Sequence, residues 1–329
     1  MKVGVLSFAH VHAAGYVPRL LAEPGVEVLT ADPAPWSDPT ELRGKAFAEQ
    51  FGAPYVDSYE ELFAWGPDCV VVTSENSRHR ELVEVAAAAG VHVLCEKPLA
   101  TTLDDALAMR KAVQDAGILF MMAFPVRFSS AFAQLRAAGL GEVFAVRGAN
   151  NGKLPTSRSW FTDPGLAGGG ALADHVVHLA DLLDALLGVE ASSVTAVTNQ
   201  VLHGDRARAE TSGLVTTTYA NGVVAAIDCS WSLPDSAPNW GGLQLSVAGT
   251  EGTVDVDFFG ASVRGIEASG SPLDLRYGAD LDAAMLSAFL DAVRTGVQPQ
   301  PDLEVGLRTL KVVLAAQESA RTGRTVTLA

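Results

Sequence analysis

A histidine and two aspartates recur at helical spacing near the middle of the chain. Asp174, His178 and Asp181 are four and three residues apart, so an α-helix places them on one face. His175 projects about a quarter turn away from them. An imidazole that is neutral near physiological pH can take and give a proton. The spacing therefore predicts a general acid–base group, and the alternative is a histidine that only packs in a core.

A second chemical feature is the segment that follows the first apolar run, where a dinucleotide-binding domain carries a glycine-rich phosphate turn. Here that segment reads Ser7-Phe8-Ala9-His10-Val11-His12, with Ser7, Ala9 and His12 at the three glycine positions. Serine and alanine leave a phosphate-sized gap, whereas His12 implies a wider or shifted helix. We predict a retained dinucleotide site of altered geometry that includes Phe8 and His10, and the alternative is a scaffold that has lost its ligand.

Asp32 stands at the end of the second apolar run, somewhat over 20 residues beyond this turn. A carboxylate at that place can accept both ribose hydroxyls of NAD and repels a 2′-phosphate. NAD is therefore favoured over NADP. The alternative is that Asp32, followed by Pro33, only caps a loop.

His10 and His12 alternate along the chain, so in an extended segment their imidazoles point the same way and could share a metal ion. No nearby cysteine or aspartate at ligand spacing completes such a site. We therefore predict no metal.

The elements that must position these residues fall into two patterns. Up to residue 122, short apolar runs without alternation are separated by amphipathic stretches, which is typical of βαβ units around a parallel sheet covered on both faces. The predicted strands are Val3–Leu6, Val26–Thr30, Cys69–Thr73, His92–Leu94 and Ile118–Met122, and the predicted helices are Tyr16–Ala22, Thr40–Phe51, Arg78–Ala89 and Leu103–Ala116.

After Met122 the pattern becomes a meander, with Asn221-Gly222 as a hairpin signal. We expect an α/β protein with a doubly wound Rossmann domain over residues 1–122 and an α+β domain with an open, mostly antiparallel sheet over residues 123–299. The predicted elements of the second part are helices Ser129–Ala138, Leu172–Leu187, Leu281–Thr295 and Leu303–Arg321, an irregular segment Asn150–Gly170, and strands Gly213–Tyr219, Val223–Trp231, Leu243–Ala248 and Thr325–Leu328.

Two longer motifs make the chain resemble a known family. One is the strand from Cys69 with its following turn, and then Glu96-Lys97-Pro98 at the end of another strand. The other is Gly168-Gly169-Gly170 followed by the Asp-x-x-x-His-x-x-Asp helix. Together they are similar to the glucose-fructose oxidoreductase / inositol dehydrogenase / MocA family, and the order of the parts agrees along nearly the whole chain.

The resemblance implies reversible hydride transfer between a nicotinamide cofactor and a secondary alcohol of a sugar, inositol or related polyol. Lys97 would stabilise the developing alkoxide, His178 would move the hydroxyl proton, and Asp174 would hold the polar network. It also implies further contacts to the cofactor and to the substrate, although surface charge and packing explain the substrate set nearly as well. The further cofactor residues are Ser74, Asn76, His79 and Glu96, and the substrate residues are Arg127, Lys153, Arg158, Trp160 and His175.

Composition limits the other possibilities. The net charge of −15, without a basic cluster, argues against nucleic acid, and the absence of a signal peptide or apolar span indicates a cytoplasmic protein without a membrane partner. Cys69, Cys95 and Cys229 are expected to be buried thiols. The resemblance implies a dimer or tetramer and a terminal helix, about 300–329, that returns to the first domain. Rival functions are a glycosidase that retains NAD and a non-enzymatic sensor or scaffold.

Overall fold

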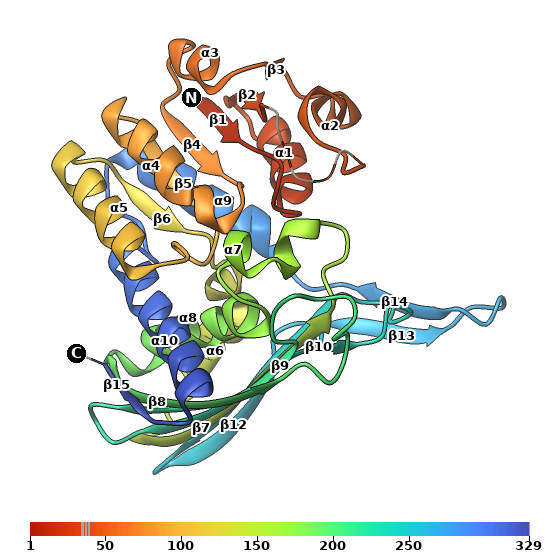
Figure 1. The fold of residues 1–329 in the computed structure, drawn as a ribbon, viewed down its shortest axis with the longest axis vertical. Coiled ribbons are helices and arrows are strands. Elements are labelled where there is room, and N and C mark those ends of the chain that lie inside the picture. Colours follow the sequence, from red (N-terminus) through yellow and green to blue (C-terminus); the bar gives the residue numbers. More distant parts are fainter. Residues whose placement is uncertain (34–35, 37, 39, 329) are drawn as a thin grey trace. The chain divides into compact units, whose positions relative to one another are not determined.

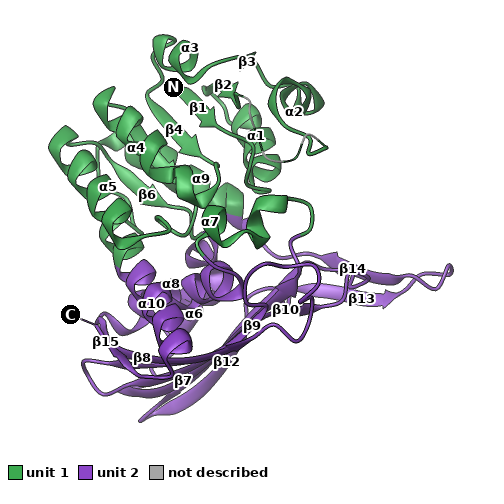
Figure 2. Cartoon of the chain, viewed as in Figure 1, with its two compact units in different colours: residues 1–124, 156–168, 282–307 green, residues 125–155, 169–281, 308–329 purple. Residues whose placement is uncertain are grey.

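The computed structural model describes residues 1–33, 36, 38 and 40–328. The chain forms two compact units, each built around one large sheet (Figure 1, Figure 2). Unit 1 comprises Met1–Phe124, Thr156–Gly168 and Asp282–Leu307, and unit 2 comprises Pro125–Pro155, Gly169–Leu281 and Arg308–Ala329.

The sheet of unit 1 has six parallel strands in the order β3-β2-β1-β4-β5-β6. Every residue of β4 is buried, as expected for a strand that is covered on both faces. From β1 the chain adds β2 and β3 on one side of the sheet, and then crosses over to add β4, β5 and β6 on the other side of β1. This reversal of strand order creates a topological switch point between β1 and β4. The strands are β1 Lys2–Leu6, β2 Glu27–Ala31, β3 Tyr55–Val56, β4 Cys69–Val72, β5 His92–Cys95 and β6 Phe120–Met122.

Helices lie on both faces of this sheet (Figure 2). The longest of the crossover helices, α5, shows why they begin and end where they do. The hydroxyl of Thr102 accepts a hydrogen bond from the amide of Asp105, and Gly117 ends the helix in the left-handed conformation. The helices of unit 1 are α1 Ala13–Ala22, α2 Gly44–Phe51, α3 Tyr59–Ala64, α4 His79–Ala88, α5 Leu103–Ala116, α7 Pro164–Ala167 and α9 Leu281–Thr295, with 3₁₀ turns Asn76–Arg78 and Ser159–Thr162.

Unit 2 contains a seven-stranded sheet in the order β12-β11-β7-β10-β9-β8-β15. Only the β7–β10 pair is parallel among these neighbours. The strands are β7 Val143–Lys153, β8 Ala191–Asn199, β9 Ser212–Tyr219, β10 Val224–Leu233, β11 Gly241–Gly249, β12 Gly252–Asp257 and β15 Val326–Thr327, and a separate hairpin pairs β13 Ser262–Ile266 with β14 Pro272–Arg276.

Helices cover one face of the seven-stranded sheet (Figure 2). Gly148 of β7 is in contact range of Leu179 on α8, and the hydroxyl of Ser319 on α10 accepts a hydrogen bond from the amide of Ala196 in β8. Residues of β9 alternate between buried and exposed, and Leu214 is 58% exposed on the opposite face. The helices are α6 Ser130–Arg136, α8 Val177–Leu187 and α10 Leu303–Thr322, with a 3₁₀ turn Pro125–Phe128 and a π-helical turn Leu172–Val176.

The predicted fold class is confirmed, and α5 and α9 have the predicted bounds. The hairpin at Asn221-Gly222 joins β9 to β10, with Gly222 at a φ of 87°. All three cysteines are buried free thiols, as expected. The predicted irregular segment is wrong for its first residues, because β7 continues to Lys153. The elements that were not predicted include β3, α3, α7, β13 and β14.

The compact units differ from the expected domains in two respects. Residues 156–168 belong to unit 1 because Trp160 and Phe161 pack against Ala9 in the first turn. Almost all of α9 also belongs to unit 1, whereas α10, the helix expected to return there, contributes only residues 303–307.

Candidate active site

The loops after four parallel strands carry most of the predicted cofactor residues. The turn after β1 and the loop after β4 are joined directly, since the amide of His10 donates to the carbonyl of Thr73 over 2.8 Å and the Thr73 hydroxyl donates to the carbonyl of Ser7 over 2.7 Å. Asp32 follows β2, and Glu96 and Lys97 follow β5. Carboxyl ends of parallel strands lie at one edge of a sheet, and ligands of such folds bind outside that edge at the switch point.

Ser7 occupies the first glycine position with a φ of 74°, in the left-handed region. Its hydroxyl donates to Oδ1 of Asp32 over 3.0 Å and accepts from the amide of Ala9 over 3.2 Å. Serine is uncommon in this conformation, and here its side chain is held by hydrogen bonds on both sides. The turn therefore keeps the backbone conformation that glycine usually supplies.

Asp32 is buried and already bound on both carboxylate oxygens. Nε and Nη2 of Arg43 each donate over 2.8 Å, and the amide of Gly44 donates over 2.9 Å. Arg43 is also 3.7 Å from Glu41 and 3.4 Å from Glu75, so three carboxylates surround one guanidinium. The predicted role of Asp32 toward the ribose hydroxyls stays a prediction. Arg43 was not predicted as a partner of Asp32, because no periodicity or motif links the two residues.

Glu96 gathers donors from the turn and from α1. Nδ1 of His12 is 2.8 Å from Oε1 of Glu96, the Tyr16 hydroxyl donates to the same oxygen over 2.6 Å, and Nε2 of His10 is 3.9 Å from Oε2. Burial raises the pKa of the Glu96 carboxyl, whereas the neighbouring His10 and His12 lower it by a larger amount. The net shift is downward, so the group is ionised. Tyr16 was missed, although its place four residues after His12 is a detectable helical spacing.

The same three side chains bring metal-ligand atoms together. One nitrogen each of His10 and His12 and one oxygen of Glu96 lie within 4.8 Å of one another. The expectation of no metal rested on the lack of an acidic partner near the two histidines. The fold supplies that partner from the end of β5, more than eighty residues away in the sequence.

Arg158 and Trp160 lie on the turn itself. Nε of Arg158 and Nε1 of Trp160 both donate to the carbonyl of Ala9, each over 3.0 Å. Trp160 is buried and stacks on Phe161 with ring centroids 4.0 Å apart. Both residues therefore brace the cofactor turn within unit 1, and their predicted role toward a substrate stays a prediction.

The predicted cofactor residues after β4 are buried and support neighbouring loops. Nδ2 of Asn76 donates to the carbonyl of Ala167 over 2.8 Å, and the hydroxyl of Ser74 donates to the carbonyl of Glu75. Nδ1 of His79 lies 3.0 Å from the carbonyl of Pro98. Burial lowers the pKa of His79, so it is a neutral donor that anchors the loop after Lys97.

Lys97 itself is buried, with 4% of its surface exposed, directly after β5. Its amide donates to Oε2 of Glu96 over 3.2 Å. An ammonium group held at the carboxyl edge of the sheet has the chemistry to stabilise a developing negative charge.

In unit 2, the predicted α-helix from Leu172 is wrong for its first turn, because Leu172–Val176 is π-helical. The i→i+5 pattern turns the backbone less per residue, so the α-helical phase that grouped Asp174 with His178 does not apply there. Asp174 instead accepts from Nε1 of Trp231 over 3.0 Å and lies 3.3 Å from Nε2 of His175. His178 follows in α8 and is half-buried.

Tight backbone approaches precede this turn. A side chain on Gly170 would overlap the carbonyl oxygen of Glu210, and Gly169 has a φ of 148°. The Glu210 carboxylate accepts from the amides of Gly170 and Leu172 over 2.8 and 3.1 Å. The glycines are therefore sterically required at the entry to the helix that carries Asp174.

Arg127 and Asp181 form a buried ion pair, with Nε and Oδ1 2.8 Å apart. Burial raises the pKa of Asp181 to about 7, against the lowering effect of Arg127. The ion pair engages Arg127 with Asp181, and the predicted role of Arg127 toward a substrate stays a prediction. Nζ of Lys153 donates to the carbonyl of Asp235. Lys153 lies on the same face of β7 as Asn151, whereas Asn150 and Gly152 lie on the other face, beside His175.

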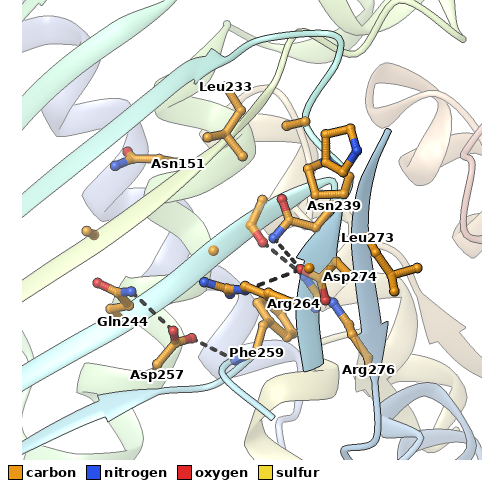
Figure 3. A pocket seen from close by; sticks show the side chains of 17 residues that line it. Asn151, Leu233, Asn239, Gln244, Asp257, Phe259, Arg264, Leu273, Asp274 and Arg276 are labelled. Carbon is orange, nitrogen blue, oxygen red and sulfur yellow. Dashed lines mark hydrogen bonds and ion pairs between the residues drawn. The ribbon is translucent and has the colours of Figure 1, made fainter. Parts of the chain in front are cut away.

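A cavity of about 520 Å³ lies between the open face of the unit 2 sheet and the β13–β14 hairpin (Figure 3). Arg264, Asp274 and Arg276 come from the hairpin, and Asn151 and Gln244 come from the sheet. The side chain of Asn151 points to the opposite face of β7 from its neighbours Asn150 and Gly152, which lie beside His175. None of the predicted site residues lines this cavity, so we do not assign the reaction to it.

Comparisons with known proteins agree with this architecture. Residues 19–124 match the family described as "Oxidoreductase family, NAD-binding Rossmann fold", and residues 128–255 match the "GFO/IDH/MocA C-terminal domain". The chain is 30% identical to the 1,5-anhydro-D-fructose reductase of Ensifer adhaerens over 86% of each chain. It is 28% identical to D-xylose 1-dehydrogenase (NADP(+)) 2 of Haloferax volcanii over the full length of both.

Solved structures show the same fold. GenD2 from gentamicin A biosynthesis, determined in complex with NAD, superposes with a TM-score of 0.87 at 25% identity over 100% of this chain and 96% of that chain. Aldose-aldose oxidoreductase from Caulobacter crescentus superposes with a TM-score of 0.79 at 26% identity over 100% and 99%.

Proposed function

Because this chain belongs to the Gfo/Idh/MocA family of oxidoreductases, we propose that it transfers hydride reversibly between a nicotinamide cofactor and a secondary alcohol of a sugar or polyol. The observation that carries the proposal is the arrangement at the carboxyl edge of the unit 1 sheet. The β1 turn, Asp32 after β2 and Lys97 after β5 all follow strand ends at the carboxyl edge of the sheet, the edge that holds the switch point.

The residues of unit 1 fit a dinucleotide in spite of the missing glycines. Ser7 holds the left-handed backbone conformation of the first glycine, and α1 begins directly after the turn at Ala13. A helix N-terminus at this place attracts a diphosphate. Bound there, the nicotinamide would serve as hydride acceptor or donor.

The protein groups would handle the proton and the charge. Hydride leaves an alcohol carbon readily only while the hydroxyl proton also leaves, so a base is required. We assign this step to His178, with the Lys97 ammonium lowering the cost of the alkoxide. Asp174 would act as a positioning residue, since its carboxylate holds the Trp231 indole and lies beside His175.

We propose NAD as the preferred cofactor, although a relative named above uses NADP. Asp32 places a carboxylate directly after β2, where the ribose of a dinucleotide lies in such folds. An added 2′-phosphate beside it would meet like charge at short range. Titration calorimetry with both cofactors tests this, and tighter binding of NADP would contradict it.

The substrate class follows from the named relatives, which act on xylose and anhydrofructose. We also propose a cytoplasmic homo-oligomer that pairs through the open face of the unit 2 sheet. Val197 and Leu214, which pair across β8 and β9, are more than half exposed there, and three free buried thiols suit a reducing compartment. Among the described residues, no helix is long and apolar enough to cross a membrane.

The decisive experiment follows NADH formation with a panel of aldoses, anhydrosugars and inositols. Lys97→Met and His178→Asn should each lower turnover by about 10²–10⁴-fold with little loss of NAD affinity. If both groups serve the same chemical step, the double variant should lose less than the product of the two effects. His203→Asn, in the loop between β8 and β9, is a matched control and should keep full turnover. Near wild-type turnover in either single variant removes that residue from the mechanism.

A further inference from the structure

The hydrogen-bond pattern fixes which atoms of His10 and His12 carry protons. Glu96 is ionised, so Nδ1 of His12 must donate across the 2.8 Å contact to Oε1. Nδ1 of His10 accepts from the amide of His12 over 3.2 Å, so the proton of a neutral His10 lies on Nε2, on the side of Glu96. The carboxylate thus orients His12 by the same kind of contact that orients histidines in catalytic and metal sites.

The opposite edge of the His12 ring is available to a ligand. One third of the side chain is exposed, and among the described residues no group hydrogen-bonds its Nε2, which is not buried. His12 immediately precedes α1, at the position of the third glycine of a dinucleotide turn. A diphosphate in such folds lies at the N-terminus of this helix.

The turn offers fewer backbone amides than a glycine-rich one. The amide of Ala9 donates to the Ser7 hydroxyl, that of His10 to the Thr73 carbonyl, and that of His12 to the His10 ring. Donors that usually face a phosphate are therefore satisfied inside the turn. A diphosphate bound here needs another source of positive charge.

We propose that the imidazolium of His12, held by Glu96, binds the diphosphate of the dinucleotide in place of the glycine amides. This inference rests on the proposed function, since it names the group that recognises the cofactor. Nε2–H would donate to a phosphate oxygen, while Nδ1–H stays on Glu96. Such a charge-assisted bond is about twice as strong as one from a neutral amide.

The charged groups around His12 favour its protonated form. Burial lowers its pKa, Glu96 raises it, Lys97 lowers it and Asp282 on α9 raises it, with a net upward shift. Tyr16 and His10 also face the ring. NAD affinity should therefore be full while His12 is protonated and fall as the pH rises through its raised pKa, by up to about tenfold per pH unit.

A transition metal at His10, His12 and Glu96 is the competing occupant. If Nε2 of His10 coordinated a metal, the ring proton would have to lie on Nδ1 of His10. There it would clash with the amide hydrogen of His12, which now donates to that nitrogen. The proton pattern therefore favours an anion at the outer edge of His12 over a cation between the rings.

The test measures calorimetric affinity of NAD, ADP-ribose and adenosine for the wild-type protein, His12→Gly and His12→Gln, from slightly acidic to alkaline pH. Both variants should bind NAD and ADP-ribose about 10- to 100-fold more weakly below the His12 pKa and lose the pH dependence. Adenosine, which has no diphosphate, should bind all three alike. His92→Gln, at the opposite end of β5 from Glu96, is the matched control and should behave as wild type.

Three outcomes would contradict the inference. If the imidazole only obstructs a glycine-type turn, His12→Gly binds NAD more tightly, and the inference is overturned while the proposed function stands. One equivalent of zinc or another transition metal in the purified protein, lost in the variants, also overturns it. A wild-type protein that binds neither NAD nor ADP-ribose overturns the proposed function and this inference together.

Discussion

The turn after β1 stands where Rossmann folds carry glycines but has none, whereas the entry to the Asp174 helix carries Gly168, Gly169 and Gly170. In unit 2, Gly170 faces the carbonyl of Glu210 so closely that no side chain fits. In unit 1, Ser7 and His12 stand at glycine positions, and their side chains bond Asp32 and Glu96.

The difference separates two reasons why a position can require glycine. Where one backbone meets another, a side chain has no space and the cost is steric. Where the backbone meets a ligand, side chains can take over the hydrogen bonds, provided that they are themselves anchored. The buried carboxylates of Asp32 and Glu96 are the anchors in unit 1.

The largest expected effect on the free energy of unfolding comes from removing the guanidinium of Arg43 beside the β1 turn. Arg43→Met leaves Asp32 buried beside Glu41 and Glu75 without a guanidinium, and should lower the free energy of unfolding by about 3–5 kcal/mol. Urea denaturation measures it. Arg206→Met, which breaks an exposed ion pair in unit 2, should cost no more than about 1 kcal/mol. Equal losses would mean that the Asp32 network does not hold the turn.

The glycine of the second region can be tested directly. Gly170→Ala should lower the free energy of unfolding by about 3 kcal/mol, because the new methyl group meets the backbone of Glu210 and not a movable side chain. Gly242→Ala in β11 is the control, since nothing lies within 4 Å of an added methyl group there. The two variants compared by denaturation should differ clearly, and a Gly170→Ala protein as stable as the control would refute the steric account.

A smaller effect is the pH dependence of stability that comes from Asp181 in unit 2. The pKa of Asp181 is raised to about 7, so the folded protein binds a proton there that the unfolded chain releases at lower pH. Stability from this group is full below about pH 4, the pKa of an unfolded aspartate, and is lost as the pH rises through about 7, by about 1 kcal/mol per pH unit between these values. Asp181→Asn should flatten this slope in denaturation series. An unchanged slope would show that another group titrates.

The buried framework of unit 1 was predictable because its strands are continuous apolar runs whose order is limited by the parallel fold. The hairpin of β13 and β14 was not, since its residues are mostly exposed and show no core-facing pattern. The π-helical turn at Leu172 was also out of reach, because the same residues suit an α-helix.

The candidate site was predictable where motif residues follow one strand end. Its partners were not, because Arg43 and the carboxylate of Glu96 reach the turn through contacts between distant parts of the chain. Sequence spacing identifies neighbours along one helix or strand. Which side chain a loop directs toward another loop depends on the tertiary fold.

The φ of 74° at Ser7 bears on how nucleotide sites are detected in genomes. A glycine fingerprint is a proxy for a backbone angle, and a serine whose hydroxyl is bonded to a downstream aspartate can hold that angle equally well. The family match of this chain begins only at residue 19, beyond the turn. A search that scored small polar residues at the first glycine together with an acidic residue after the second strand would recover such turns.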